Sequence, residues 1–139
     1  MLNKTLAHLF ERDITKIVEE IKLYQNEEDL WVIKGDISNS AGNLALHIIG
    51  NLNHFVGFAL GNTGYIRDRE AEFKTTSIPR EELIKALKST IEIVKNSLSL
   101  LKSGDGEKPF PLEKHGEILS TNYMLLHLLA HLNYHLGQI

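Results

Sequence analysis

Apolar residues recur at steps of three and four along four long stretches of the chain, the spacing of one buried face on an α-helix. We predict helices at about 2–25, 40–61, 78–102 and 123–139. In the first and third of these, the inward faces are formed by Leu6, Phe10, Ile14, Ile17, Ile21 and Tyr24, and by Leu83, Leu87, Ile91, Val94, Leu98 and Leu101. The pattern favours an all-α fold.

Polar and Gly/Pro-rich segments separate these stretches. "WVIKGDISNSAG" predicts an extended piece near Trp31–Ile33 and a turn at Gly35, before Ser and Asn residues that suit the start of the second helix. Ser77 is the candidate cap of the third helix. The charged stretch 62–76 predicts a long loop. Since no repeat or linker divides the chain, we expect residues 1–139 to form a single domain, a four-helix bundle.

Composition narrows the classes of function. The chain has 139 residues, a formal net charge of -3 and no cysteine. The charge gives no reason to expect nucleic acid as a partner. Without cysteine, a metal site must use His, Asp, Glu or water. We find no run of about 18 apolar residues and no signal peptide, so we expect no membrane span and a cytoplasmic protein.

Three of the seven histidines lie in the C-terminal stretch "HLLAHLNYHLGQI". His131 and His135, one turn apart, continue the core stripe that Met124 and Leu128 begin. A buried imidazole requires a hydrogen bond or a ligand, and two imidazoles at i and i+4 can bind one metal ion. The alternative is a hydrogen-bonded core network without metal.

A third ligand would have to come from another helix. The second helix offers His47 and His54, seven residues apart and roughly on one side. Both stay open on spacing alone, although they are too far apart to share one tetrahedral ion. His127 is turned about 80° around its helix from His135 and is predicted to flank the site. His8 and His115 have no spacing partner and are predicted to lie on the surface or in loops.

Two short segments resemble a known family. "HLNYHLGQI" is similar to the C-terminal signature of the DinB-like (damage-inducible) superfamily, and "LHIIGN" is similar to its second-helix segment. The resemblance implies a four-helix bundle with an unusual connection between the second and third helices, often dimeric. It also implies a metal triad of His47, His131 and His135. Some members are transferases or isomerases that use low-molecular-weight thiols such as mycothiol or bacillithiol.

Three neutral imidazoles leave coordination positions open, as in catalytic rather than closed structural sites. We expect one divalent transition metal, Zn or Ni first, although imidazole also suits Cu and Fe. Metal binding should weaken below about pH 6.5, because protonated imidazole cannot coordinate. We expect His54, His127, Asn51 and Gln138 in a second shell or as alternative ligands.

Two interpretations apply to Arg67 and Arg69 in "YIRDREAEF". They are candidates for holding the carboxylate of a substrate at the mouth of the site. The alternative is a lattice of ion pairs that attaches the long loop to the bundle, with Tyr65 and Phe73 anchoring its ends.

Three functions remain in competition. The first is a metal-dependent enzyme, a thiol transferase, isomerase or hydrolase acting on a small molecule. The second is a bundle tied by metal without turnover, and the third is a metal-free bundle with a binding role. The resemblance implies a homodimer. A second apolar stripe on the last helix, formed by Leu125, Leu129, Leu132 and Leu136, is our candidate contact.

Overall fold

The computed structural model describes residues 2–113 and 116–139, and in this part of the chain the secondary structure is helical. The four long helical stretches are α1 (Leu2–Leu23), the helix that begins with α2 (Ala41–Leu52), α5 (Arg80–Ser99) and α6 (Thr121–Gln138). The described residues contain no strand, and one isolated antiparallel bridge joins Pro109 to Ser120. The prediction of an all-α fold is confirmed.

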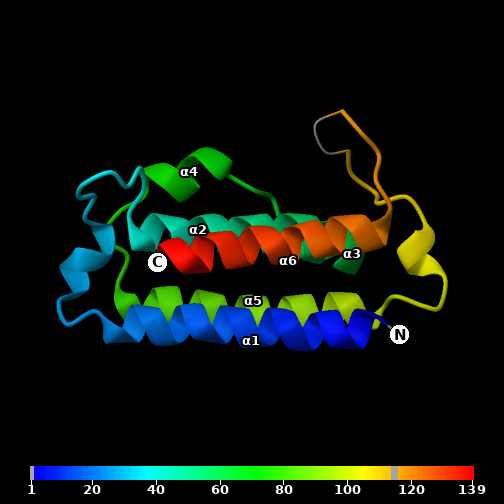
Figure 1. The fold of residues 1–139 in the computed structure, drawn as a ribbon, viewed down its shortest axis with the longest axis horizontal. Helices are drawn as coiled ribbons and strands as arrows, with labels where there is room; N and C mark the ends of the chain where they lie inside the picture. The colour runs from blue at the N-terminus through cyan, green and yellow to red at the C-terminus, as the bar shows by residue number, and fades with distance from the viewer. Residues whose placement is uncertain (1, 114–115) are drawn as a thin grey trace.

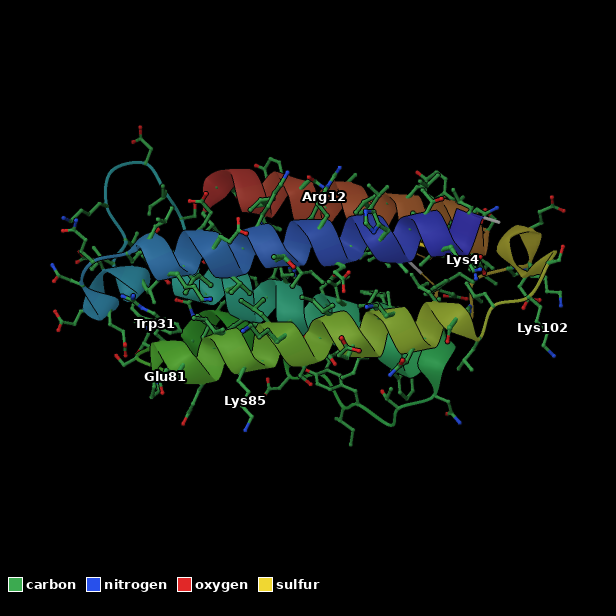
Figure 2. The ribbon with its side chains drawn as sticks, turned by 90° about the horizontal axis from the view of Figure 1, so that it is seen from below. Lys4, Arg12, Trp31, Glu81, Lys85 and Lys102 are labelled. Carbon is green, nitrogen blue, oxygen red and sulfur yellow. The ribbon has the colours of Figure 1, made fainter. Side chains whose placement is uncertain are left out.

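The long helices lie side by side along the molecule (Figures 1 and 2). α1 packs against α5 and α6, and α2 packs against the same two helices. Figure 1 shows that α2 and α5 run in one direction, opposite to α1 and α6. The connection between α2 and α5 must therefore return along the outside of the helices, and it does so over α2.

The core is formed by the predicted stripes. The fully or nearly fully buried side chains include Leu6, Phe10, Ile14, Ile17 and Ile21 from α1, and Leu83, Leu87, Val94 and Leu98 from α5. Burying each of these side chains contributes roughly 1.5–3 kcal/mol relative to leaving it in water.

The proposed contact stripe on α6 is largely part of this same core. Leu125 and Leu132 are each only 1% exposed. Leu129 and Leu136 are partly buried and pack against the core. Our interpretation of this stripe as a dimer contact is wrong, because the chain itself covers it.

The second helix starts where the sequence predicts and then changes its geometry. The Oγ of Ser40 accepts a hydrogen bond from the backbone N–H of Asn43, which caps α2. Residues Asn53–Phe58 form a π-helical segment, η2, and α3 (Ala59–Gly61) completes the helix. A π turn holds more residues than an α turn, so positions in this segment are rotated relative to an unbroken α-helix.

The connection from 62 to 79 is more ordered than we predicted. It contains a short helix, α4 (Arg69–Lys74), whose cap Asp68 accepts a hydrogen bond from the backbone N–H of Ala71. Acidic residues in its first turn favour this helix. Ser77 is not the cap of α5: that position is Pro79, and Ser77 itself has a φ of 62°. The capping prediction is wrong, because α5 begins only at Arg80, directly after Pro79, and Ser77 lies too far before it to act as the cap.

Two smaller predictions differ in outcome. Trp31 ends a 3-10 helix, η1 (Glu27–Trp31), so the predicted extended piece begins only at Val32, with a φ of -91° and a ψ of 134°. The turn at Gly35 is confirmed, with a φ of 62°. A further 3-10 turn, η3 (Asp105–Glu107), follows α5.

Within the described residues, one helix, Ala41–Gly61, is long and apolar enough to cross a membrane by length and mean hydropathy. However, 56% of its apolar window is buried inside the protein. Its buried residues include the polar side chains Asn43, His47, Asn51 and Asn53. This is the pattern of a core helix.

Candidate metal centre

Three histidines from two helices converge between α2 and α6. The Nε2 atom of His131 lies 3.1 Å from Nε2 of His47 and 3.1 Å from Nε2 of His135. The three candidate ligand atoms all lie within 4.8 Å of one another. His47 is buried, and the two histidines of α6 are half-buried. The i, i+4 spacing thus presents both imidazoles of α6 to one point, as predicted.

A carboxylate fixes the orientation of His47 from the other side. The Nδ1 of His47 lies 3.0 Å from Oε1 of Glu72, on α4. Burial pushes the pKa of Glu72 upward, but hydrogen bonds from His47 and Arg67 outweigh this effect and hold the pKa below its ordinary value. An ionised carboxylate only accepts hydrogen bonds, so the proton of neutral His47 is placed on Nδ1.

His135 is oriented in a similar way by its own helix. Its Nδ1 lies 2.7 Å from Oε1 of Gln138, one turn later. Burial lowers the pKa of His135, and the hydrogen bond to Gln138 opposes this shift only in part. Both Nδ1 atoms therefore act as donors, which turns the Nε2 lone pairs of His47 and His135 towards the same point.

This arrangement fits a metal ion better than a closed hydrogen-bond network. If Nε2 of His131 carries the proton, its single N–H can donate to Nε2 of His47 or to Nε2 of His135, but not to both. Ligand nitrogens of a tetrahedral ion with bonds of about 2.0–2.1 Å lie about 3.3 Å apart. Two of the three separations, at 3.1 Å, are close to that value, and the third, between His47 and His135, is within 4.8 Å. The donor set, three imidazoles with two hydrogen-bonded at Nδ1, matches the second-shell pattern of metal-binding histidines.

The other histidines lie elsewhere. His54 is in the π-helical segment and stacks on Phe58, with ring centroids 5.8 Å apart. Burial, together with the charge of Arg67, lowers its pKa. His127 is exposed and stacks on Tyr123, with ring centroids 6.4 Å apart. His8 is exposed, as predicted, and His115 lies outside the described residues.

The two arginines have different surroundings. Arg67 donates to Glu72 twice, from Nε to Oε2 at 2.9 Å and from Nη2 to Oε1 at 3.0 Å. Its guanidinium also lies over the ring of Phe55. Arg69 is exposed, and its guanidinium lies over the ring of Phe73, 5.7 Å from the centroid. The Arg67–Glu72 ion pair lies within the 62–76 stretch, and this stretch contacts the second helix through Glu72 and His47 and through Arg67 and Phe55.

Gly50 explains how Glu72 reaches His47. A Cβ atom at position 50 would collide with the carboxylate of Glu72. Glycine lets α4 approach the backbone of α2 at this point, at a cost of roughly 1 kcal/mol in helix propensity relative to alanine. The Glu72 carboxylate therefore occupies the space that a side chain at position 50 would fill.

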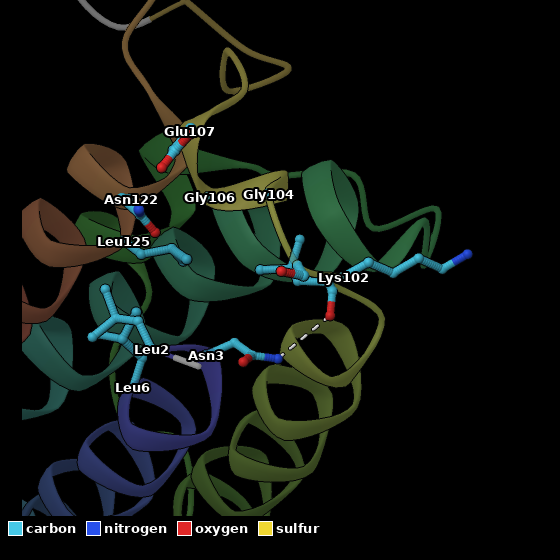
Figure 3. Close-up of a pocket in the computed structure, with 11 residues that line it drawn as sticks. Leu2, Asn3, Leu6, Lys102, Gly104, Gly106, Glu107, Asn122 and Leu125 are labelled. Atoms are coloured by element: carbon cyan, nitrogen blue, oxygen red, sulfur yellow. Dashed lines mark hydrogen bonds between the residues drawn. The ribbon is translucent and has the colours of Figure 1, made fainter.

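A cavity of about 310 Å³ opens beside the triad, lined by His47, Asn51, Phe55, Arg67, Arg69, Glu113 and His131. A smaller cavity of about 150 Å³ lies near the N-terminus of α1 (Figure 3). Its described lining residues include no histidine. Of these two cavities, the one beside the triad is lined by histidines.

The model of the DinB superfamily matches residues 8–139, nearly the whole chain. The chain belongs to the DinB superfamily. Comparison with curated proteins and with solved structures gave no match. The resemblance of the two histidine segments to this superfamily is thereby confirmed.

Sequence reasoning within the DinB motifs missed Glu72. No carboxylate was predicted beside the triad, whereas Glu72 reaches it from α4, 25 residues after His47 in sequence. One signal for it was present: a glycine three residues after His47, in a helix rich in apolar residues. Such a glycine indicates close approach of another group, but not which one.

Proposed function

We propose that the chain binds one divalent transition metal ion through His47, His131 and His135 and uses it for transfer or hydrolysis on a small molecule. The scaffold would be a four-helix bundle of the DinB type, with 62–76 as the long connection between its second and third helices. The observation that carries the proposal is the convergence of three Nε2 atoms while two Nδ1 atoms are held by Glu72 and Gln138.

Each residue has a distinct part in this proposal. The three imidazoles would hold the ion, with Zn or Ni favoured by the nitrogen donors. Glu72 and Gln138 keep two rings in the tautomer that leaves Nε2 free to coordinate. When bound, the ion would lower the pKa of a water or thiol in an open coordination position. The adjacent cavity provides space for a small substrate or low-molecular-weight thiol.

The open site favours an enzyme over a purely structural role. Three protein ligands plus open positions are typical of catalytic zinc, whereas structural zinc usually has four protein ligands. Among the described residues, the group of metal-competent side chains contains three histidines and no fourth member. A cavity next to two of them gives access from solvent.

Elemental analysis of protein purified without an affinity tag tests metal binding. After removal of metal by a chelator and reloading with Zn²⁺ or Ni²⁺, we expect one ion per chain. Protein that takes up no stoichiometric metal would refute the proposal and favour the metal-free bundle.

A second measurement separates catalytic from structural metal. In Co²⁺-loaded protein, we expect the visible absorption spectrum to change when 2-mercaptoethanol is added, because a thiolate can enter an open position. A spectrum that stays constant across the titration would favour an ion that only ties α2 to α6.

A further inference from the structure

Asn51 is a polar residue beside the triad whose carboxamide makes no hydrogen bond to the described residues. It lies one helical turn after His47, is 4% exposed and lines the cavity beside the triad. None of the side-chain hydrogen bonds in the described part of the chain involves its carboxamide. Its polar atoms are not among the fully buried side-chain atoms that lack a partner, and the residue lines the cavity. Water or a ligand in the cavity can therefore hydrogen-bond to this carboxamide.

Arg69 faces the same cavity with an uncommitted charge. Arg67 is occupied by its two hydrogen bonds to Glu72, and its side chain is 12% exposed. In contrast, Arg69 makes no ion pair with any described residue. Its guanidinium lies over the ring of Phe73, which restricts its orientation while its N–H groups stay available. Guanidinium groups bind carboxylates through two parallel hydrogen bonds.

The charge of the cavity also favours an anion. The lining includes Arg67, Arg69 and Glu113, with the carboxylate of Glu72 behind Arg67. The charges of the two arginines and two glutamates cancel. A divalent ion on the triad would therefore leave two positive charges around the cavity. An anionic group compensates them, whereas a cationic ligand would add to the repulsion.

We propose that this cavity binds a small carboxylate-bearing molecule. Its carboxylate pairs with the guanidinium of Arg69, and a neighbouring polar group hydrogen-bonds to the carboxamide of Asn51. The volume of about 310 Å³ lies at the lower end of the range for small-molecule sites, which suits a small ligand. This inference rests on the proposed function in one respect: it names the substrate class of the same site.

The test uses 3-hydroxypropionate as the probe and its neutral amide, 3-hydroxypropionamide, as the matched ligand without charge. Both are titrated into ¹⁵N-labelled full-length protein, metal-free and Zn²⁺-loaded, with the side-chain amide resonance of Asn51 as the readout. We expect saturable shifts with the carboxylate and much weaker binding of the amide. Equal binding of the two ligands would overturn the proposal.

Two variants and a control locate the binding groups. Arg69→Gln should weaken binding of 3-hydroxypropionate about 10-fold or more, because hydrogen bonds between charged groups are lost. Asn51→Leu should weaken it several-fold without changing the metal stoichiometry. Lys74→Gln removes an exposed cation from the same short helix and should leave binding unchanged. An equal effect of Lys74→Gln and Arg69→Gln would overturn the assignment.

The same samples separate this inference from the proposed function. Metal stoichiometry is measured on each protein before the titration. Protein that binds no metal but prefers the carboxylate ligand through Arg69 would refute the metal centre and support the cavity assignment. Protein that binds one ion but shows no preference for the carboxylate ligand would support the metal centre and refute the cavity assignment.

Discussion

The imidazole of His47 and the carboxylate of Glu72 lie 3.0 Å apart, although Glu72 is in α4, within the long connection that follows the second helix. Glu72 is held in turn by two hydrogen bonds from Arg67. The connection is therefore part of the candidate metal centre. Through Glu72 it determines which nitrogen of His47 faces the two histidines of α6.

Replacing this carboxylate tests its role. Glu72→Gln keeps the size of the side chain but removes its charge. We expect the affinity for Zn²⁺ to fall about 10- to 100-fold, the usual effect of losing such an outer hydrogen-bond partner. Competition with a chromophoric chelator measures this. Glu70→Gln, on the same helix, removes a carboxylate whose partner is the exposed Lys74, and should leave the affinity unchanged. A Glu72→Gln protein with the affinity of the unaltered chain would contradict the prediction.

Histidine replacements test the ligand set. We expect His131→Ala or His135→Ala to abolish stoichiometric metal and to remove the increase in unfolding temperature that bound metal gives. His54→Ala and His127→Ala should leave most of the metal bound. If His54→Ala empties the site while His47→Ala does not, the assignment on the second helix is wrong. If no replacement changes the metal content, the cluster is a core network.

Gly50 should be intolerant of even one added carbon. In Gly50→Ala, the new Cβ meets the carboxylate of Glu72, so we expect a loss of roughly 1–3 kcal/mol in the free energy of unfolding and weaker metal binding. Gly137→Ala is the control, because a Cβ there meets nothing within 4 Å. It should stabilise the helix by up to about 1 kcal/mol. Equal stabilisation by both substitutions, measured by urea unfolding, would show that α4 can move away freely.

A buried carboxylate on α1 predicts acid sensitivity. Asp13 is fully buried and accepts hydrogen bonds from Arg12 and from Asn133 on α6. Burial raises its pKa, but these hydrogen bonds outweigh burial and leave the pKa below its ordinary value. Because the folded pKa is depressed, the stabilisation is present above the unfolded value of about 3.9 and is lost as pH falls through the folded pKa.

The Asn133→Leu variant isolates this contribution. It should lower the free energy of unfolding by about 1–2 kcal/mol at pH 7, because the hydrogen bond to an ionised group is lost. The difference from the unaltered chain should become smaller in acid, where Asp13 is protonated in both. Denaturant unfolding at pH 7 and at acid pH measures it. An equal difference in the free energy of unfolding at both pH values would show that the ionised Asp13 is not involved.

We expect a homodimer that uses the outer face of α6. Tyr123, Leu126 and Tyr134 on this helix are 56%, 51% and 66% exposed. Exposed apolar groups along one helix face are typical of protein contacts. Leu126→Glu should convert the dimer to a monomer in light scattering, whereas Leu23→Glu, at an exposed leucine near the end of α1, should not. A monomer mass for the unaltered chain at micromolar concentrations would refute the expectation.

Local sequence determined the helices and the pair of histidines on the last one. Apolar residues at steps of three and four identify the buried side of α1 and α5, since a helix must bury such a stripe. Ser40 identifies the start of α2 because its side chain caps a neighbouring backbone N–H. His131 and His135 face one point because they lie one turn apart on the same helix. These are relations between residues close in sequence.

Only the tertiary structure decided the rest of the centre. The choice of His47 over His54 depends on how α2 packs against α6 and on the π-helical segment that begins at Asn53. The spacing of the histidines in the sequence predicts neither feature. The contact of Glu72 with His47 depends on α4 folding back over Gly50. The burial of Leu125 and Leu132 depends on which face of α6 meets α1. Contacts between distant segments follow from the packing of whole helices, and a periodic pattern specifies a buried face without specifying its neighbour.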